Sequence, residues 1–352
     1  MRILITGGTG LIGRHLCKAL LEEGHQLTVL SRHPETVAVK CGAAVQPRRG
    51  GAEPSGEGVA ALHLLPQTAG FAITSDLASV VGSPSRMTSS YNSNVSEVQA
   101  MASLDEWRPE QTFDAVINLA GEPIVDAYWS TMRKQVLRDS RIALTEKLVQ
   151  RIAAVKQKPN VLLSGSAIGY YGDRGDTELD EAAADGKDFA AELCKDWEEA
   201  ALAAEKHGVR VCLLRTGLVL SKSGGLLGRM LLPFRLGLGA RLGNGRQWMS
   251  WIHVADYVAL VQRLLHDEQM CGPFNMTAPK PVTNAEFTGT LAYTLHRPAL
   301  FVVPGVVLKL AMGERAALLL EGQRVLPTKL TAAGAQFKYP SLSSALDALL
   351  SR

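Results

Sequence analysis

The sequence predicts an α/β protein with a doubly wound parallel sheet and a smaller, mostly helical C-terminal lobe. Three observations support this class. Short apolar runs alternate with segments of helical periodicity, which is the order of a parallel sheet covered by helices. The first run leads through a glycine-rich turn into a helix. With 352 residues, 46% of them hydrophobic and 20% charged, the chain is long enough for one large domain or two.

The first elements are a strand and a helix. Residues 2–6 (RILIT) form an apolar, β-branched run, and residues 11–23 have helical spacing that ends at Gly24, a residue typical of helix C-termini. A second strand follows in HQLTVLSR. Further strands are predicted at residues 114–121, 160–167 and 209–217, with helices at residues 133–154 and 189–206.

Residues 36–106 interrupt this alternation. They are rich in Gly, Ser, Pro and Ala and lack the sustained periodicity of their flanks. Loops of such length are uncommon inside compact domains. We therefore expect most of the segment to be a partly disordered insertion, and a lid or a partner-binding arm is the alternative.

The pattern changes again near residue 225. The segment FRLGLGARLGNGRQWMSW is rich in Gly and Arg, and helices are then predicted at residues 255–267, 284–296, 314–323 and 341–351. We expect a sheet domain over residues 1–224 and a helical lobe over residues 225–352.

Charge and cysteine content exclude several classes of protein. The formal charge of +3 comes from dispersed Lys and Arg, which disfavours nucleic-acid binding. The cysteines are odd in number and include no CxxC pair, so neither a disulfide framework nor a metal site is predicted: Cys17, Cys41, Cys194, Cys212 and Cys271. No signal peptide and no apolar stretch of membrane-spanning length is visible. We expect a soluble cytoplasmic protein, and a homodimer is left open.

The segment ITGGTGLIG, residues 5–13, carries the most specific motif. Gly7, Gly10 and Gly13 stand at a strand-to-helix turn, where missing side chains allow a tight turn and close approach of a pyrophosphate. The free N–H groups at the helix N-terminus favour the same anion. Because the motif follows a strand and opens a helix, we interpret it as the dinucleotide site of a Rossmann domain, with a merely glycine-rich turn as the alternative.

The end of the second strand, VLSRHP, bears on the choice of dinucleotide. Sites specific for NAD usually carry Asp or Glu here, whereas an Arg accommodates the 2′-phosphate of NADP. Ser31 and Arg32 occupy this place. The sequence therefore predicts NADP(H) as the cofactor, and the alternative is a solvated Arg at a strand end.

Several motifs form a combination that covers nearly the whole chain except the insertion: TGGTGLIG, SRHP, NLAGEP, SGSAIGYYGD, LLRTGLVL, LPFRLGLG, WIHVAD and GPFNMTAPKPVTNAEF. Together they resemble the epimerase-like proteins of the short-chain dehydrogenase/reductase superfamily, in particular its atypical 39U branch. The resemblance implies a Rossmann domain with a small C-terminal domain, NADP(H) binding and an epimerase-like role without a settled substrate.

The resemblance also implies a set of cofactor contacts. These are Gly7, Thr9, Gly10, Leu11 and Ile12 for the pyrophosphate, Ser31 and Arg32 for the 2′-phosphate, Leu119 and Ala120 beside the adenosine, and Val219 near the nicotinamide. Arg141 stands four residues before Thr145, where related enzymes usually carry Asn. An Arg there can add a cofactor contact, and a surface helix Arg is the alternative.

The catalytic pattern of the superfamily is where this sequence departs. Related enzymes use a Ser after the fifth strand, and a Tyr whose proton transfer is assisted by a Lys four residues later. Ser166 and Lys195 match, but Ala191 stands in place of the Tyr. Tyr170 is the substitute proton donor that the sequence offers. Packing of Tyr170 and Tyr171 under the C-terminal lobe is the alternative.

Basic and aromatic residues are concentrated around the expected substrate cleft. Arg235, Arg246, Trp248, Trp251 and His253 lie within a short span. Arginines suit a phosphate or carboxylate, and aromatic rings suit a ring face, which favours an acidic or sugar-like substrate. For His253, in the apolar segment WIHV, a structural role is the alternative.

Two functions follow from these residues. The leading one is an NADP-dependent oxidoreductase or epimerase that acts on an unidentified small acidic or sugar-like molecule. The alternative is a catalytically silent NADPH-binding regulator whose bound cofactor sets its affinity for a partner. The missing Tyr favours the regulator, and the cleft residues favour the enzyme.

Overall fold

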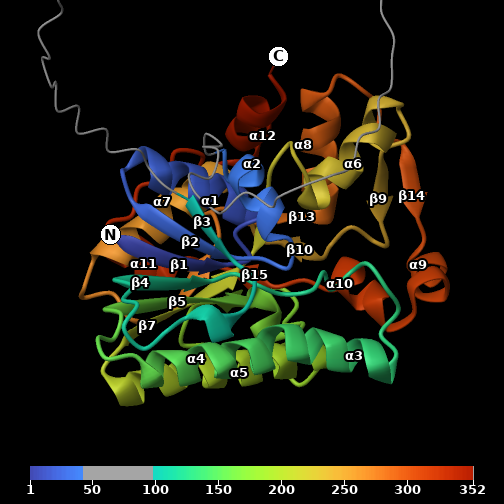
Figure 1. Ribbon diagram of the computed structural model, residues 1–352. Helices are drawn as coiled ribbons and strands as arrows, with labels where there is room; N and C mark the ends of the chain where they lie inside the picture. Colours follow the sequence, from blue (N-terminus) through green and yellow to red (C-terminus); the bar gives the residue numbers. More distant parts are fainter. Residues whose placement is uncertain (43–97, 352) are drawn as a thin grey trace, which may run out of the picture. The chain divides into compact units, whose positions relative to one another are not determined.

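The computed structural model describes residues 1–42 and 98–351 (Figure 1). A seven-stranded sheet runs through it in the order β3-β2-β1-β4-β5-β7-β12, and every neighbouring pair is parallel. Its strands are β1 (Arg2–Thr6), β2 (Gln26–Leu30), β3 (Val98–Met101), β4 (Ala115–Asn118), β5 (Val161–Ala167), β7 (Arg210–Thr216) and β12 (Gly272–Met276). The order reverses between β1 and β4, which is where open α/β sheets bind their ligands.

Helices cover both faces of the sheet (Figure 1). One face carries α1 (Leu11–Glu22), α2 (Val37–Cys41) and α7 (Val254–His266), and the other carries α3 (Thr131–Arg138), α4 (Leu144–Ala154) and α5 (Phe189–Leu202). Short turns lie between and after them: η1 (Pro34–Thr36), η2 (Leu104–Glu106), the π-helical η3 (Asp139–Ala143) between α3 and α4, η4 (Ile168–Tyr171) and η5 (Ala203–His207). The predicted doubly wound α/β class is confirmed.

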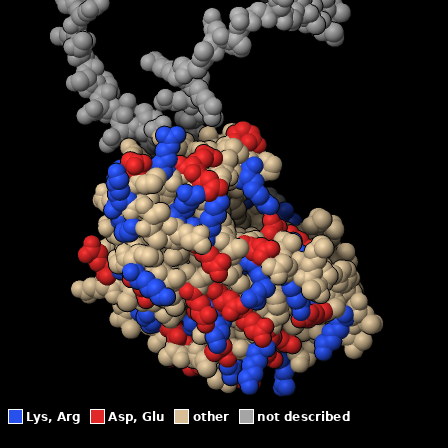
Figure 2. Space-filling view, turned by 60° about the horizontal axis from the view of Figure 1, so that its bottom comes forward, with Lys and Arg blue, Asp and Glu red and all other residues tan. Residues whose placement is uncertain are grey.

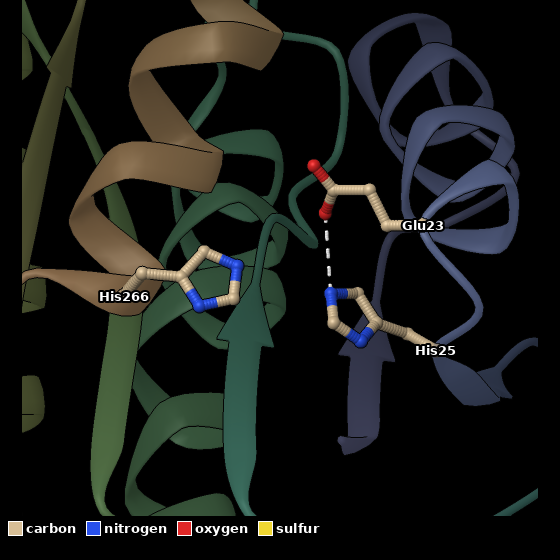
Figure 3. A group of neighbouring side chains, drawn as sticks. All are labelled: Glu23, His25 and His266. Atoms are coloured by element: carbon tan, nitrogen blue, oxygen red, sulfur yellow. Dashed lines mark hydrogen bonds and ion pairs between the residues drawn. The ribbon is translucent and has the colours of Figure 1, made fainter.

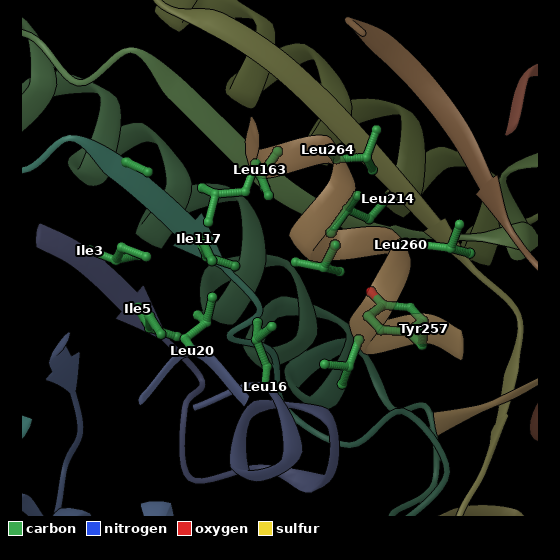
Figure 4. Close-up of a cluster of buried hydrophobic side chains, with 14 of the residues drawn as sticks. Ile3, Ile5, Leu16, Leu20, Ile117, Leu163, Leu214, Tyr257, Leu260 and Leu264 are labelled. Atoms are coloured by element: carbon green, nitrogen blue, oxygen red, sulfur yellow. The ribbon is translucent and has the colours of Figure 1, made fainter. Parts of the chain in front are cut away.

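Alternate residues of each strand fill two separate cores. Ile3 and Ile5 pack with Leu16 and Leu20 of α1, in the cluster drawn in Figure 4, whereas Leu4 belongs to the core beneath α4. Successive side chains of a strand point to opposite faces, so an uninterrupted apolar run is what a strand covered on both sides requires.

The C-terminal lobe has its own apolar core. This core contains Phe234, Trp251, Phe287 and Leu346. The lobe's helices are α6 (Gly225–Arg235), α8 (Asn284–Thr294), α9 (Gly305–Met312), η6 (Gly313–Ala316), α10 (Ala317–Leu320), α11 (Thr328–Ala332) and α12 (Leu342–Leu350). Its short strands, with β6 of the preceding segment, pair in twos: β6 (Glu178–Leu179), β8 (Leu218–Leu220), β9 (Ala240–Leu242), β10 (Trp248–Met249), β11 (Trp251–His253), β13 (Val282–Thr283), β14 (Phe301–Val303) and β15 (Arg324–Val325).

Both ends of the segment expected as an insertion belong to the sheet region, which corrects the predicted range of residues 36–106. Helix α2 buries Val37 and Cys41 in the core under α1, and β3 pairs with β2. These elements are four or five residues long, too short for a periodicity that the sequence reveals. The rest of that segment lies outside the described residues.

The division of the chain at residue 225 stays a prediction. Helix α7 and strand β12 come from the residues expected to form the lobe, yet β12 is a strand of the large sheet and α7 packs against α1.

On the face that carries α3, α4 and α5, acidic and basic side chains are interspersed (Figure 2). Within the part of the chain that the structure describes, no helix has the length and apolar character of a membrane span.

Candidate functional site

The β1–α1 turn is closely packed at its three motif glycines, and at Gly7 and Gly13 it leaves no room for a Cβ. Gly7 has φ +70°, and a Cβ there would lie 2.5 Å from the carbonyl oxygen of Leu119. A Cβ on Gly13 would lie 2.2 Å from the carbonyl oxygen of Gly7, and one on Gly10 would lie 3.2 Å from the same atom. The motif therefore brings the helix, the turn and the end of β4 into direct backbone contact.

The N-terminus of α1 is open for an anion. Its N-cap is Gly10, no side chain caps it, and no acidic residue occupies its first turn. The first N–H groups of a helix have no acceptor within the helix, so the amides of Leu11, Ile12 and Gly13 are free to bind an anion. Thr9 and Leu11 are partly exposed beside them. These residues fit the pyrophosphate of a dinucleotide.

A chain of buried hydrogen bonds fixes the end of β4 against this turn. The hydroxyl of Thr6 donates to Oδ1 of Asn118 at 2.6 Å and accepts from the backbone amide of Ala120 at 3.2 Å. The side-chain amide of Asn118 donates to Oγ1 of Thr145 at 2.8 Å. Leu119 and Ala120 thus lie at the carboxyl edge of the sheet beside the glycine turn, and their contact with an adenosine stays a prediction.

Arg32 lies at the end of β2 and reaches toward the loop after β4. Its side chain is 86% exposed and forms an ion pair with Glu122, at 3.0 Å. The hydroxyl of the neighbouring Ser31 accepts from the backbone amide of His33. Because an exposed ion pair is weak, a doubly charged phosphate can replace Glu122 as the partner of Arg32. Sequence reasoning missed Glu122, which lies in the quoted motif NLAGEP.

Arg141 contacts the loop that follows β4. Its guanidinium donates to the carbonyl oxygen of Glu122 at 2.9 Å and lies where a side chain on Gly121 would have to go. Burial lowers the pKa of Arg141. The residue is in η3, and π-helical turns of this kind are frequent at functional sites. Of the two interpretations, a surface helix Arg is wrong, and a direct cofactor contact stays a prediction.

Val219 lies in β8, close to the N-terminus of α1. A Cβ on Gly225 would lie 3.5 Å from the carbonyl oxygen of Val219 and 2.9 Å from the side chain of Leu11. The segment around Val219 therefore runs past the first turn of α1. This is the side of the turn where the resemblance places the nicotinamide.

Behind this edge lies a buried ionic network that the sequence did not reveal. Arg215 of β7 binds Glu198 of α5 through two hydrogen bonds of 2.9 Å, and the two side chains are only 5% and 6% exposed. Ser166 donates to the same carboxylate at 2.6 Å. Burial opposes the charge of Arg215, but its bonds to Glu198 raise its pKa. Ser166 is thus a partner of this ion pair.

The two tyrosines after β5 have different environments. Tyr171 is fully buried, accepts from Arg215 and donates to Asn275, and burial raises its pKa to about 12. Tyr170 is partly exposed, and the guanidinium of Arg215 lies over its ring at 3.6 Å from the centroid. A cation against the ring face fixes the ring's position. Tyr170 is therefore the phenol that a ligand can reach.

Lys195, predicted as a catalytic residue, lies on the exposed side of α5, and its catalytic role stays a prediction. Its side chain is 49% exposed, and its ammonium forms an ion pair with Asp185 that raises its pKa. One turn earlier on the same helix, Ala191 is fully buried, and a Cβ on Gly186 would lie 3.0 Å from its side chain. A tyrosine at position 191 would have to displace buried neighbours. Lys195 is near enough to Tyr170 for that phenol to contribute to its raised pKa.

Two of the expected substrate residues belong to the interior instead. Trp251 is fully buried in the lobe's core, and its indole donates to the carbonyl oxygen of Lys280. His253 accepts from the amide of Ala255 at the start of α7, lies against the ring of Tyr339 at a tilt of 37°, and has its pKa lowered to about 4 by burial. The prediction that Trp251 and His253 bind substrate is wrong, because the short apolar strand that carries them is covered on both sides.

The two predicted arginines are exposed. Arg235 is the last residue of α6, and Arg246 lies in the turn before β10. Among the described residues, no hydrogen bond or ion pair engages either guanidinium. Trp248, by contrast, donates to Asp176 and stacks under Arg324. That Arg235 and Arg246 bind the same substrate stays a prediction.

Comparison with known proteins agrees with this arrangement. The model of the NAD dependent epimerase/dehydratase family matches residues 3–276, and that of a domain of unknown function (DUF1731) matches residues 303–349. The chain is 35% identical over 353 residues to the epimerase family protein SDR39U1 homolog, chloroplastic, of Arabidopsis thaliana, which covers 99% of this chain and 87% of the relative. It is 44% identical over 250 residues to the epimerase family protein Mb2239 of Mycobacterium bovis, with 68% and 82% covered.

A solved structure is similar over the same length. The crystal structure of human epimerase family protein SDR39U1 (isoform 2) with NADPH aligns with a TM-score of 0.75 and 29% identity, over 99% of both chains. The resemblance read from the motifs is therefore confirmed. The chain belongs to the NAD dependent epimerase/dehydratase family and is an NAD(P)-binding relative of SDR39U1.

Proposed function

We propose that the chain binds NADP(H) at the turn between β1 and α1. The observation that carries this proposal is the uncapped N-terminus of α1, packed so closely on the turn that a side chain at Gly13 would meet the carbonyl oxygen of Gly7 at 2.2 Å. Such a turn presents backbone amides to the pyrophosphate without any side chain in between. The human relative was solved with NADPH, which supports the same cofactor.

Selection of NADP(H) over NAD(H) rests on Arg32. The 2′-phosphate offers this guanidinium a dianion, in place of the single carboxylate of Glu122 that it now pairs with at 3.0 Å. NADPH should bind at least tenfold more tightly than NADH, a difference of about 1.4 kcal/mol. Binding is followed by the fluorescence of the reduced nicotinamide.

Three variants separate Arg32 from nonspecific charge effects. Arg32→Ala should remove the preference for NADPH, while Arg108→Ala, at another exposed arginine, should leave it unchanged. Glu122→Gln should tighten NADPH and leave NADH nearly unaffected, because it removes the carboxylate that competes for Arg32. Equal affinities for the two cofactors in the unmodified protein would contradict the proposal.

We further propose an oxidoreductase or epimerase-like activity on a small acidic or sugar-like molecule, with Tyr170 as the proton donor. Tyr170 follows β5 at the carboxyl edge of the sheet and is partly exposed over Arg215. The unpaired guanidiniums of Arg235 and Arg246 are candidates for an anionic group of the substrate. The bound nicotinamide would supply the hydride chemistry.

A phenylalanine at position 170 tests the activity. Proton transfer by a positioned group is typically worth about 10²- to 10⁴-fold in rate. Tyr170→Phe should therefore lose activity to that degree on any substrate found in a panel of carbonyl compounds and nucleotide sugars, and keep its NADPH affinity. Tyr293→Phe, at an 83% exposed tyrosine, is the control.

One observation favours the alternative, an NADPH-binding regulator without turnover. Ala191 removes the tyrosine of the superfamily's proton-transfer pair, so Lys195 has no phenol four residues before it on α5. A regulator would leave NADPH unoxidised across the substrate panel and a metabolite extract, and its affinity for a protein partner would depend on the bound cofactor.

Reducing conditions such as those of the cytoplasm suit the free cysteines, four of which are buried.

A further inference from the structure

A second group of chemically active side chains lies at the other end of α1. Glu23 follows the last turn of α1, His25 precedes β2, and His266 is the last residue of α7. Figure 3 shows the side chains of Glu23 and His25 directed toward the imidazole of His266. One ligand atom from each residue lies within 4.8 Å of the other two. This cluster is at the amino edge of the sheet, away from the dinucleotide turn.

The end of α1 explains why Glu23 and His25 are adjacent. The amide of Gly24, with φ +81°, donates to the carbonyl oxygen of Leu21, and the amide of His25 donates to that of Leu20. These two bonds make a Schellman motif, in which a glycine in the left-handed region reverses the chain. The reversal places the Glu23 carboxylate 3.1 Å from Nε2 of His25.

Neighbouring residues contact the side chains of Glu23 and His25 on the sides away from each other. The amide of Gln262, one turn before His266, donates to Oε1 of Glu23 at 2.7 Å, and Nδ1 of His25 lies 3.2 Å from the main-chain nitrogen of Met1. Oε2 of Glu23 and Nε2 of His25 lie against each other, within 4.8 Å of a ring nitrogen of His266. Second contacts of this kind orient the ligands in metal sites.

We propose that Glu23, His25 and His266 bind a divalent transition-metal ion, with Zn²⁺ as the best fit. Two imidazole nitrogens and one carboxylate oxygen are a preferred ligand set of Zn²⁺, and soft thiolate ligands are not needed. Tetrahedral bonds of about 2.0–2.1 Å place ligand atoms roughly 3.3 Å apart. The pair of Glu23 and His25 already has this spacing, and the exposed side chain of His266 has only to move inward.

The chemistry of the site at neutral pH agrees with this assignment. Metals bind neutral imidazole, and Nε2 of His25, beside the carboxylate of Glu23, is the atom that would hold the ion. On binding, the Nε2 proton of His25 would leave to solvent, and the ring would stay neutral by taking a proton on Nδ1 from the main-chain nitrogen of Met1, 3.2 Å away, which would become a neutral amine. Water would occupy the fourth position.

The consequence of binding is a link between two distant parts of the chain. The metal would tie the α1–β2 turn to the end of α7, the helix that comes from the region following residue 225. Because the unfolded chain does not hold the three ligands together, binding stabilises the folded form and raises its unfolding temperature in proportion to the logarithm of free Zn²⁺. Cysteine spacing gave no hint of this site, because none of its ligands is a cysteine.

The test uses the full chain without a polyhistidine tag and with nothing added before Met1. Zn²⁺ is titrated in competition with a chromophoric chelator, and thermal unfolding is followed in parallel. We expect one Zn²⁺ per chain with micromolar or tighter affinity, and X-ray absorption that shows two imidazole ligands. His266→Gln and Glu23→Gln should each weaken binding at least tenfold, while His207→Gln, at an exposed histidine of η5, should match the unmodified protein.

The outcomes divide cleanly. His266 and Glu23 are exposed, so their variants should unfold at the unmodified temperature in the presence of EDTA and lose only the increase caused by Zn²⁺. Absence of stoichiometric Zn²⁺ binding in the unmodified protein would overturn the proposal, as would binding at full affinity by both variants. NADPH binding does not enter this test, so the two proposals fail independently.

Discussion

Removing the charge of Glu198 should cost the protein a large part of its stability. In Glu198→Gln the shape of the side chain is kept, but Arg215, which is 4% exposed, loses its counter-charge. Leaving one member of a buried ion pair without its partner typically costs about 3–5 kcal/mol in free energy of unfolding. For a chain of 352 residues, that corresponds to a decrease of roughly 4–7 °C in the midpoint of thermal unfolding.

Contacts around the pair set the size of the effect. Ser166 donates to the same carboxylate, so its hydroxyl loses a charged acceptor as well. Ser166→Ala alone leaves both bonds from Arg215 to Glu198 in place and should cost only about 1–2 kcal/mol. The double variant should lose less free energy of unfolding than the two single variants lose in sum, because both substitutions act on the same carboxylate.

The free energy of unfolding of each variant is measured in urea and by thermal unfolding, and NADPH titration checks that the dinucleotide site is intact. Glu199→Gln is the matched control, since Glu199 is exposed on the same helix. The reasoning is refuted if Glu198→Gln unfolds within about 0.5 kcal/mol of that control, the range of ordinary surface substitutions. NADPH affinity should be nearly unchanged, because the glycine turn binds the cofactor through other elements.

Two further predictions concern the turn and the lobe. Gly13→Ala places a Cβ 2.2 Å from the carbonyl oxygen of Gly7 and should lower NADPH affinity at least tenfold, whereas Gly289→Ala, which meets nothing within 4 Å in α8, should be neutral or stabilising by thermal unfolding. His253 has a pKa of about 4 in the folded protein against 6.5 ordinarily. The unfolded chain therefore binds its proton first, and stability should fall by at most roughly 3 kcal/mol as the pH drops from 6.5 to 4. His253→Asn, which keeps the helix cap, should flatten this decrease in urea unfolding measured across that range; an unaltered slope would assign it to other groups.

Some parts of the fold were predictable because their physics is local. The glycines of the β1–α1 turn, the strand that precedes them and the helix that follows are within one short segment, so Gly7, Gly10 and Gly13 point to their geometry directly. The same holds for β5 and α5, whose bounds differ from the prediction by only a few residues. Strand β3 is different, since it forms by pairing with β2, from which a long segment of the chain separates it.

The candidate site was predicted less well where it depends on long-range contacts. Nothing in the sequence around Arg215 or Glu198 indicates that the two residues pair. They become a buried ion pair only because α5 packs against β7. Trp251 shows the converse error: an aromatic residue in a glycine- and arginine-rich stretch suggests a ligand, yet the lobe uses it as core. In both cases burial, which a single sequence does not specify, decides the role.

The missing tyrosine at position 191 has a physical explanation in this network. In this chain the buried side of α5 faces β7 through Glu198, and the segment around Gly186 closes over Ala191. Restoring only the tyrosine would force a ring into that contact, and Lys195 would still face solvent beside Asp185. A proton donor for the nicotinamide edge must therefore come from outside α5. In the proposed enzyme Tyr170 would be that donor, because Arg215 lies over its ring and the side chain is partly exposed. A loss of activity in Tyr170→Phe would then tie the proposed catalysis to the same ion pair that stabilises the fold.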